Sequence, residues 1–165
     1  MIRVDHAGEY GAVRIYEGQL AVLKARRGAQ GSVAAITEMA KQEDHHLRTF
    51  DRLVNEHQVR PTALEPLWRV AGFALGAASA LMGEKAAMAC TAAVEEAIDA
   101  HYASQIARLD DDDPLKATIA RFRADEASHR DEALKRGAEQ APGYKFLSEA
   151  VKSGCRLAIK LSERI

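Results

Sequence analysis

The sequence has few of the features that mark disulfide-rich, nucleic-acid-binding or β-sheet proteins. Its only cysteines, Cys90 and Cys155, match no Cys-x-x-Cys spacing, which argues against a disulfide framework and against a zinc or rubredoxin-like iron site. The formal net charge is -1, without the basic excess expected of a nucleic-acid-binding surface. Alternating Val, Ile and Thr runs and Asn-Gly turns are nearly absent, which argues against a β-sheet.

Helical signals dominate instead, separated by short breaks. The breaks predict six helices, near residues 3–26, 32–58, 65–82, 84–110, 114–136 and 142–163. The clearest start is the run of aspartates before Pro114, because Asp favours the N-cap and Pro the first helical position. With 165 residues and 47% hydrophobic content, the chain has enough apolar mass for one all-α domain, residues 1–165.

Two of these helices place a glutamate and a histidine, three residues apart, within an apolar stripe. The pairs are Glu43 with His46 and Glu126 with His129. Residues at alternating steps of three and four lie on one face of a helix. The stripes are Ile36, Met39, Glu43, His46, Phe50, Leu53 and Leu115, Ile119, Phe122, Glu126, His129, Ala133. Both pairs are therefore expected on the buried face.

Two further helices carry one glutamate each in a matched pattern. Glu9 is followed by tyrosine at +7 and glutamine at +10, and Glu95 is followed in the same way. The four acid-bearing helices thus occur as two similar sets at nearly constant distance along the chain. This predicts an internal duplication of a three-helix unit, with pseudo-repeats 1–83 and 84–165.

Four carboxylates and two imidazoles on buried faces need positive charge. Burying an unpaired carboxylate costs on the order of several kcal/mol. Neighbouring acids also raise one another's pKa. A Glu on each of two helices with Glu-x-x-His on each of two others is the pattern of di-iron carboxylate bundles. The alternative is a set of buried ion pairs. We therefore predict two metal ions, iron favoured over manganese, held by Glu9, Glu43, His46, Glu95, Glu126 and His129.

His101 and Tyr102 are further candidate site residues. Either side chain could hydrogen-bond a ligand or carry a proton or electron near the metals, or they could be a packed tyrosine and a histidine at the rim. The same two interpretations apply to Tyr16, the counterpart of Tyr102 in the first half of the chain. The other polar neighbours are expected away from the site: His45 off the stripe, His57 at a helix end, His6 without an identifiable partner, and Glu17, Glu96 and Asp125 facing elsewhere.

Several stretches, covering essentially the whole chain, resemble one family. They are IRVDHAGEYGA, RPTALEPLWRVAGFALGA, MACTAAVEE and GCRLAIKLSER, and they are similar to the demethoxyubiquinone hydroxylases, di-iron monooxygenases of the ferritin-like superfamily. The resemblance implies a four-helix bundle with two additional helices and the six ligands above. It also places His101 and Tyr102 at the family's His-Tyr dipeptide.

The resemblance further implies the reaction. It is hydroxylation of the ring of a polyprenylated demethoxyquinone, demethoxyubiquinone to demethylubiquinone, in ubiquinone biosynthesis. The implied cofactors are two iron ions per chain, O2 and a reductant expected to be NADH. No Gly-x-Gly-x-x-Gly follows a strand, so no Rossmann site is expected for the nicotinamide.

A substrate with an isoprenoid tail requires contact with a bilayer. The uncharged run 70–82 is shorter than the roughly 20 residues that span a membrane, Trp68 and Arg69 suit an interface, and small residues would let another helix approach. We expect the helices near 65–82 and 142–163 to contact the membrane surface. The alternative is a core or dimer-contact helix. The small residues are Gly72, Gly76 and Ala80, and the basic residues expected at headgroups are Lys145, Lys152, Arg156 and Lys160.

These expectations define partners and a location. A lipid-binding accessory protein of the ubiquinone complex is implied by the resemblance, a homo-oligomer is possible, and no nucleic acid is expected. The chain opens without a signal or transit pattern, so it is expected either to be cytosolic or to have lost a presequence. Together with the expected membrane contact, this favours the cytoplasmic side of a bacterial inner membrane, with the matrix side of the mitochondrial inner membrane as the alternative. The rival functions are another ferritin-like di-iron oxidase or peroxidase, a non-catalytic iron-storage or iron-sensing protein, and a quinone-binding scaffold.

Overall fold

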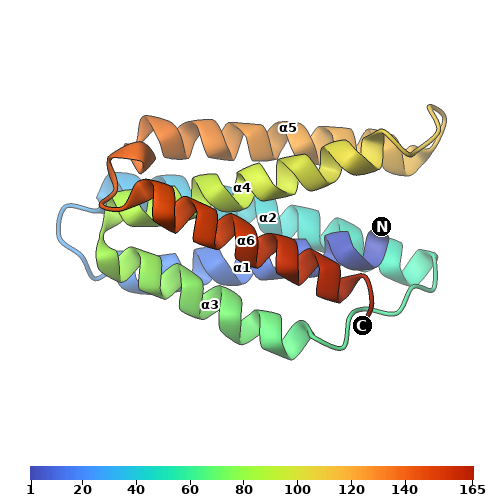
Figure 1. The fold of residues 1–165 in the computed structure, drawn as a ribbon, viewed down its shortest axis with the longest axis horizontal. Coiled ribbons are helices and arrows are strands. Elements are labelled where there is room, and N and C mark those ends of the chain that lie inside the picture. Colours follow the sequence, from blue (N-terminus) through green and yellow to red (C-terminus); the bar gives the residue numbers. More distant parts are fainter.

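The computed structural model describes residues 1–165 and is entirely helical, as the sequence predicts (Figure 1). Most helix ends fall within three residues of the predicted ones. The exceptions are the fourth helix, which ends at Ile106, and a short 3-10 helix that was not predicted. The elements are α1 (Ile2–Leu23), α2 (Gln30–Glu56), α3 (Glu65–Met82), α4 (Glu84–Ile106), α5 (Pro114–Lys135), η1 (Ala138–Gln140) and α6 (Tyr144–Ser162).

Four helices, α1, α2, α4 and α5, form the central bundle, and two more pack on its outside (Figure 1). Within the bundle α1 packs closely on α2 and α4 on α5, while α3 covers α1 and α6 covers α4. The all-α, ferritin-like bundle with two additional helices is thus confirmed. Each half of the chain supplies two bundle helices and one outer helix.

The predicted apolar stripes form the core. On α2, Ile36 and Phe50 are fully buried, and on α5 so are Ile119, Phe122 and Ala133. Tyr16, Leu23, Ile36, Met39 and Met88 belong to one apolar cluster, and Phe50, Tyr102, Ile119 and Phe122 belong to another. Along both α2 and α5 the Glu-x-x-His pair falls between residues of these two clusters.

Local sequence accounts for the turn that begins α5. The Asp113 carboxylate accepts a hydrogen bond from the Leu115 backbone N–H at 2.8 Å, and Pro114 occupies the first helical turn. This is the predicted N-cap. Between α3 and α4 the chain turns at Gly83, whose φ of 125° strongly favours glycine.

Helix α3 packs on α1 through glycines from both helices. A Cβ added at Gly76 would lie 1.9 Å from the Ile15 carbonyl oxygen, and one added at Gly18 would lie 2.2 Å from the Phe73 carbonyl oxygen. The close helix approach predicted at Gly72 and Gly76 is therefore confirmed. With its small residues against α1, α3 turns its larger apolar residues outward.

The outward faces of α3 and α6 expose large apolar side chains. Val70 is 67% exposed, Leu81 70% and Phe146 83%, and Leu67, Phe73, Met82 and Leu157 are also exposed. We call these seven residues the apolar face. No helix is both long enough and apolar enough to cross a membrane.

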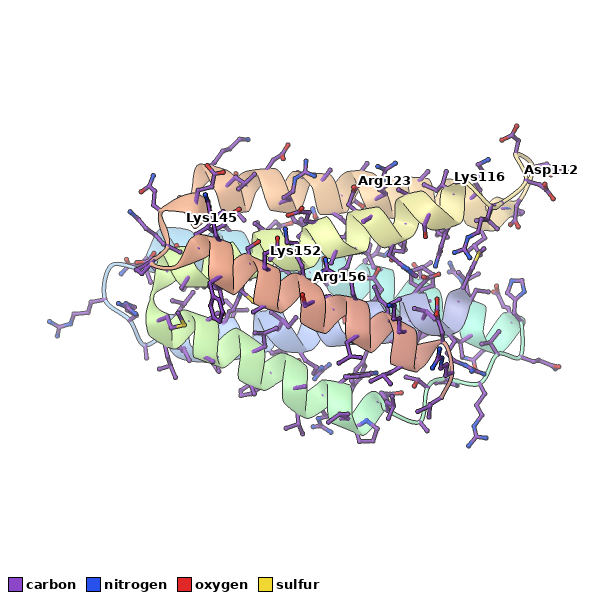
Figure 2. All side chains as sticks on the ribbon, viewed as in Figure 1. Asp112, Lys116, Arg123, Lys145, Lys152 and Arg156 are labelled. Carbon is purple, nitrogen blue, oxygen red and sulfur yellow. The ribbon has the colours of Figure 1, made fainter.

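Two ion pairs join α4 to its neighbours, through Arg123 of α5 and Lys152 of α6, both labelled in Figure 2. Arg123 of α5 pairs with Asp99 at 2.8 Å, and Lys152 of α6 pairs with Glu96 at 3.2 Å and with Glu149 at 2.7 Å. Lys152 is therefore held by two carboxylates, unlike the exposed Lys145, Arg156 and Lys160 of the same helix.

Candidate metal centre

The six residues predicted as ligands come together inside the bundle, one or two from each of its four helices. None of them is more than 3% exposed. They form two groups of four, and within each group the ligand atoms all lie within 4.8 Å of one another. The groups are Glu9, Glu43, His46, Glu126 and Glu43, Glu95, Glu126, His129. Glu43 and Glu126 belong to both, so their carboxylates lie between two positions suited to a cation.

Both histidines point Nδ1 into the cluster. His46 Nδ1 lies 3.2 Å from Glu126 Oε1 and 3.6 Å from Glu9 Oε2. His129 Nδ1 lies 3.1 Å from Glu43 Oε1, 3.3 Å from Glu126 Oε2 and 3.8 Å from Glu95 Oε1. His46 Nδ1 also lies 4.0 Å from Glu43 Oε2. Each imidazole therefore faces both shared carboxylates and one further glutamate, Glu9 for His46 and Glu95 for His129.

Each of the other two glutamates is held by a tyrosine from the opposite half of the chain. Tyr16 Oη donates to Glu95 Oε1 at 2.5 Å, and Tyr102 Oη donates to Glu9 Oε1. In both cases the other carboxylate oxygen has no hydrogen-bond partner. The structure thus brings Tyr16 and Tyr102 to the cluster.

His101 does not reach it. Its Nε2 lies 3.0 Å from Asp5 Oδ1 and 2.7 Å from Gln105 Nε2, and Gln105 also donates to Asp5 at 2.5 Å. Burial raises the pKa of Asp5, although His101 and Gln105 act against this. Of the predicted His-Tyr pair, only the tyrosine touches a candidate ligand.

The outer nitrogens of the two cluster histidines have partners that sequence reasoning missed. His46 Nε2 lies 3.2 Å from Asp125 Oδ2, and His129 Nε2 lies 2.6 Å from Gln42 Oε1. The prediction that Asp125 faces elsewhere is therefore wrong. One signal was present: Gln42 and Asp125 each directly precede the glutamate of a Glu-x-x-His pair.

The remaining histidines behave largely as predicted. His45 and His57 are exposed. His6, for which the sequence suggested no partner, is buried and its Nε2 lies 2.9 Å from Asp51 Oδ1. Glu17 and Glu96 are exposed, as predicted.

Burial of several acids in one place shifts their protonation. Burial, followed by the repulsion of Glu126, raises the pKa of Glu43 and of Glu95 well above the ordinary value. Burial also raises the pKa of Glu126. The pKa of Tyr16 rises well above its ordinary value for the same reasons, burial first and then Glu95. Without a cation, burial therefore disfavours the charged form of these three carboxyl groups.

The two histidines respond in opposite directions. Burial acts to lower the pKa of His46, but Glu126 and Glu9 outweigh it and raise that pKa to about 10. Burial lowers the pKa of His129. A proton on His46 would have to leave before its nitrogen could bind a cation.

The donor set fits a pair of cations. Each of the six residues carries at least one buried nitrogen or oxygen without a hydrogen-bond partner, and such atoms are costly to bury unless something satisfies them. Carboxylate oxygens and imidazole nitrogens suit iron and manganese. The shared Glu43 and Glu126 suit bridging positions in a dinuclear centre.

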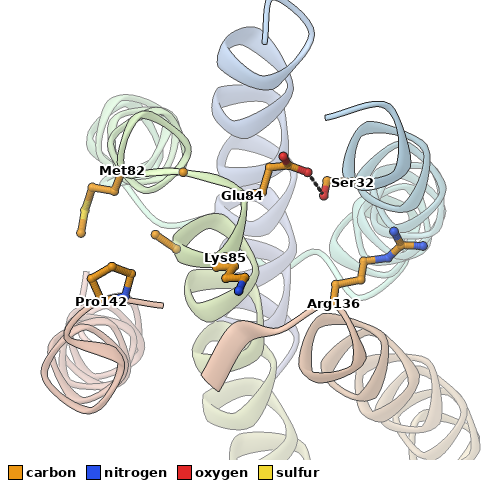
Figure 3. Close-up of a pocket in the computed structure, with 8 residues that line it drawn as sticks. Ser32, Met82, Glu84, Lys85, Arg136 and Pro142 are labelled. Carbon is orange, nitrogen blue, oxygen red and sulfur yellow. Dashed lines mark hydrogen bonds between the residues drawn. The ribbon is translucent and has the colours of Figure 1, made fainter. Parts of the chain in front are cut away.

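Two surface cavities lie away from this cluster. One, of about 360 Å3, opens where α3 meets α4 and is lined by residues such as Ser32, Glu84 and Arg136, with a 2.6 Å hydrogen bond from Ser32 to Glu84 (Figure 3). The other, also about 360 Å3, is mainly apolar and includes Ile2, Val59 and Leu115. None of the six cluster residues lines either one.

Fold and site together define a ferritin-like bundle whose buried carboxylate and histidine cluster could hold metal. The family model described as "Ubiquinone biosynthesis protein COQ7" matches residues 1–162. The chain belongs to this family, as the resemblance of its motifs predicted.

Named relatives support the assignment. The chain is 60% identical over 165 residues to the "3-demethoxyubiquinol 3-hydroxylase" of Rhodospirillum rubrum, a match covering 99% of this chain and 76% of the relative. It is 52% identical over 170 residues to the human "NADPH-dependent 3-demethoxyubiquinone 3-hydroxylase, mitochondrial", covering 100% and 76%. It is 40% identical over 181 residues to the "5-demethoxyubiquinone hydroxylase, mitochondrial" of Saccharomyces cerevisiae, covering 100% and 77%.

Proposed function

We propose that this chain is a di-iron monooxygenase that hydroxylates the ring of a polyprenylated demethoxyquinone in ubiquinone biosynthesis, using O2. The observation that carries the proposal is the pair of buried ligand groups sharing Glu43 and Glu126. It occurs in a chain 60% identical to an enzyme named as a demethoxyubiquinol hydroxylase. An iron-storage or scaffold role would leave that similarity unexplained.

In this proposal each iron has one glutamate and one histidine of its own. Glu9 and His46 would hold one ion, Glu95 and His129 the other, and Glu43 and Glu126 would bridge them. The bound iron pair would supply the activation of O2 that ring hydroxylation requires. The protein's own contribution is to place the six ligands, orient them and keep water away.

Tyrosine hydrogen bonds orient the two outer glutamates. Because Tyr16 occupies one oxygen of Glu95 and Tyr102 one oxygen of Glu9, the second oxygen of each is free to face a cation. The Phe122 ring stacks on the His46 ring with centroids 3.9 Å apart, and both residues are fully buried. These contacts hold the imidazole in one orientation and exclude water beside it.

We infer a reduced nicotinamide as the electron source. The relatives from human, mouse and Dictyostelium discoideum are named as NADPH-dependent, while the motif resemblance suggested NADH. The fold has no strand and hence no Rossmann unit for the cofactor. Measuring turnover with each nicotinamide separately decides between them.

We place membrane contact at the apolar face. Large apolar side chains of α3 and α6, such as Val70, Leu81 and Phe146, are exposed, and α6 also exposes the cations Lys145, Arg156 and Lys160, a combination suited to a lipid surface. Lys152 is left out of this proposal because Glu96 and Glu149 hold it. The same face would receive substrate from a lipid-binding accessory protein or contact another copy of the chain. The location would be the cytoplasmic side of a bacterial inner membrane, or the matrix side of the mitochondrial one.

A reconstituted reaction tests the function. Iron-loaded protein, reduced nicotinamide, O2 and a demethoxyquinone should give a product heavier by one oxygen atom in mass spectrometry. Glu95→Ala should lower the iron content and abolish turnover, whereas Glu96→Ala, the exposed neighbour, should retain both. No product from a preparation holding about two irons per chain would refute the hydroxylase proposal. Full iron content in Glu95→Ala would refute the ligand assignment.

A further inference from the structure

The two halves of the candidate metal centre match closely, except in what holds the outer nitrogen of each histidine. On each side a tyrosine donates to the outer glutamate, and on each side the histidine turns Nδ1 inward. Beyond His46, however, Nε2 meets the Asp125 carboxylate, while beyond His129 it meets the Gln42 amide oxygen. A charged acceptor therefore supports one imidazole and a neutral acceptor the other.

A second difference between the two halves concerns the partners of Gln105 and Gln19, and it again gives a carboxyl group to the side of Glu9 and His46. Gln105 donates to the carboxyl group of Asp5, one turn before Glu9 on α1. The corresponding Gln19 donates at 3.2 Å to the hydroxyl of Thr91, one turn before Glu95 on α4. Both differences thus put a carboxyl group on the side of Glu9 and His46 and a neutral group on the side of Glu95 and His129.

We propose that the two metal positions are inequivalent and fill in order, the position at Glu9 and His46 first, with Asp125 as the positioning residue that makes it the tighter one. This rests on the proposed function, since it takes the six residues as ligands. The physical reason is the hydrogen bond between the Nε2–H of each histidine and its outer partner. Nε2–H donates to its outer partner, which fixes the tautomer that leaves Nδ1 free for the metal.

The acceptor then sets how strongly Nδ1 donates. A carboxylate draws the Nε2 proton more strongly than an amide oxygen, which makes the imidazole a better electron donor at Nδ1. The Asp125 side chain is 42% exposed, so solvent weakens its effect without removing the hydrogen bond. Removing such an outer partner typically weakens metal binding by about 10–100-fold.

Cobalt(II) titration of the metal-free full chain tests the order of filling. Its absorption and heat of binding report affinity without any turnover, and its paramagnetism shifts nearby proton signals in NMR. The parent should bind two ions in two resolved steps, with the shifted Nε2–H signal of His46 present at one equivalent and that of His129 appearing with the second. Signals are assigned with His46→Gln and His129→Gln.

Three variants locate the cause. Asp125→Asn should weaken the first step by about 10–100-fold and bring the two steps together, and Asp125→Glu should restore the separation. Gln42→Glu should tighten the second step. Asp44→Asn is the matched control: it removes the same charge beside Glu43, but Asp44 pairs at 2.9 Å with Arg48 on the surface, and both steps should be unchanged.

Several results would overturn the proposal while leaving the hydroxylase function standing. They are two indistinguishable steps in the parent, a first ion at His129, or an Asp125→Asn variant that folds by circular dichroism and keeps both affinities. Ordered filling in a chain that gives no hydroxylated product would do the reverse, refuting the function and supporting the inequivalence. Uptake of only one ion would overturn both.

Discussion

Substituting Gly76 by alanine should destabilise the protein through the packing of α3 on α1. The added Cβ would lie 1.9 Å from the Ile15 carbonyl oxygen, and real Cβ atoms essentially never approach below 3.0 Å. The neighbouring atom is backbone and has no rotamer to change, so α3 has to move away from α1 by about 1 Å. Contacts at Gly72 and Gly18 along the same interface would open with it.

The size of the effect follows from two opposing terms. Overpacking costs about 1–3 kcal/mol, and the upper end applies because the clash is with backbone. The better helix propensity of alanine offsets about 1 kcal/mol. We expect a net loss of about 2 kcal/mol in the free energy of unfolding, which for this length lowers Tm by about 4–8 °C.

Urea and thermal unfolding of chelator-treated protein measure this loss. Gly154→Ala is the control, because Gly154 lies within α6 and an added Cβ there meets nothing within 4 Å; that variant should gain about 0.5–1 kcal/mol. A Gly76→Ala protein as stable as Gly154→Ala would show that α3 does not pack on α1 in this way.

Three further predictions concern the candidate site and the apolar face. The raised pKa values of the buried acids, Glu95 among them, mean that the folded metal-free chain binds more protons than the unfolded one. Its stability should therefore fall as pH rises above about 4.5, and added manganese should reduce the fall; a flat profile in chelator would contradict this. Tyr16→Phe leaves a buried oxygen of Glu95 without its donor and should cost about 1–3 kcal/mol in urea unfolding, whereas Tyr10→Phe, which loses no hydrogen bond to a candidate ligand, should cost little. Replacing Val70 and Phe73 together by serine should reduce liposome co-flotation and turnover of a long-tailed quinone, but not of a short-tailed one; equal flotation would argue against membrane contact at α3.

The fold was predictable where periodicity and capping act within one helix. Five residues of the α5 stripe, Ile119 to Ala133, are buried as predicted, and Asp113 caps that helix. The end of α4 was harder to predict. No Gly or Pro precedes the aspartate run, yet the helix ends at Ile106, where the Arg108 N–H bonds to the Gln105 carbonyl at 2.9 Å in a tightened final turn.

In the candidate site, too, residues marked by the pattern of their own helix could be predicted, and residues defined by contacts between helices could not. Glu43, His46 and their counterparts could be selected because they interrupt apolar stripes. Asp125 and Gln42 could not be selected in this way, because each lies about 100° around its helix from that stripe. Their shared position, directly before a candidate ligand glutamate, gains its meaning only when the histidine of the facing helix is known. The choice between the two interpretations of His101 stayed open in the sequence for the same reason, since its partner Asp5 belongs to another helix.

The hydrogen bonds around the cluster span long stretches of chain. Tyr102 and Glu9 are 93 residues apart, Tyr16 and Glu95 79, and His129 and Gln42 87. Such contacts close only after both halves of the chain have docked, and they add to the folding barrier through loop closure. During synthesis, a nascent chain ending near residue 83 would hold Glu9 and half of each pairing, but no complete ligand group. A complete ligand group therefore forms only after both halves of the chain have been made and have docked, so loading of metal follows synthesis.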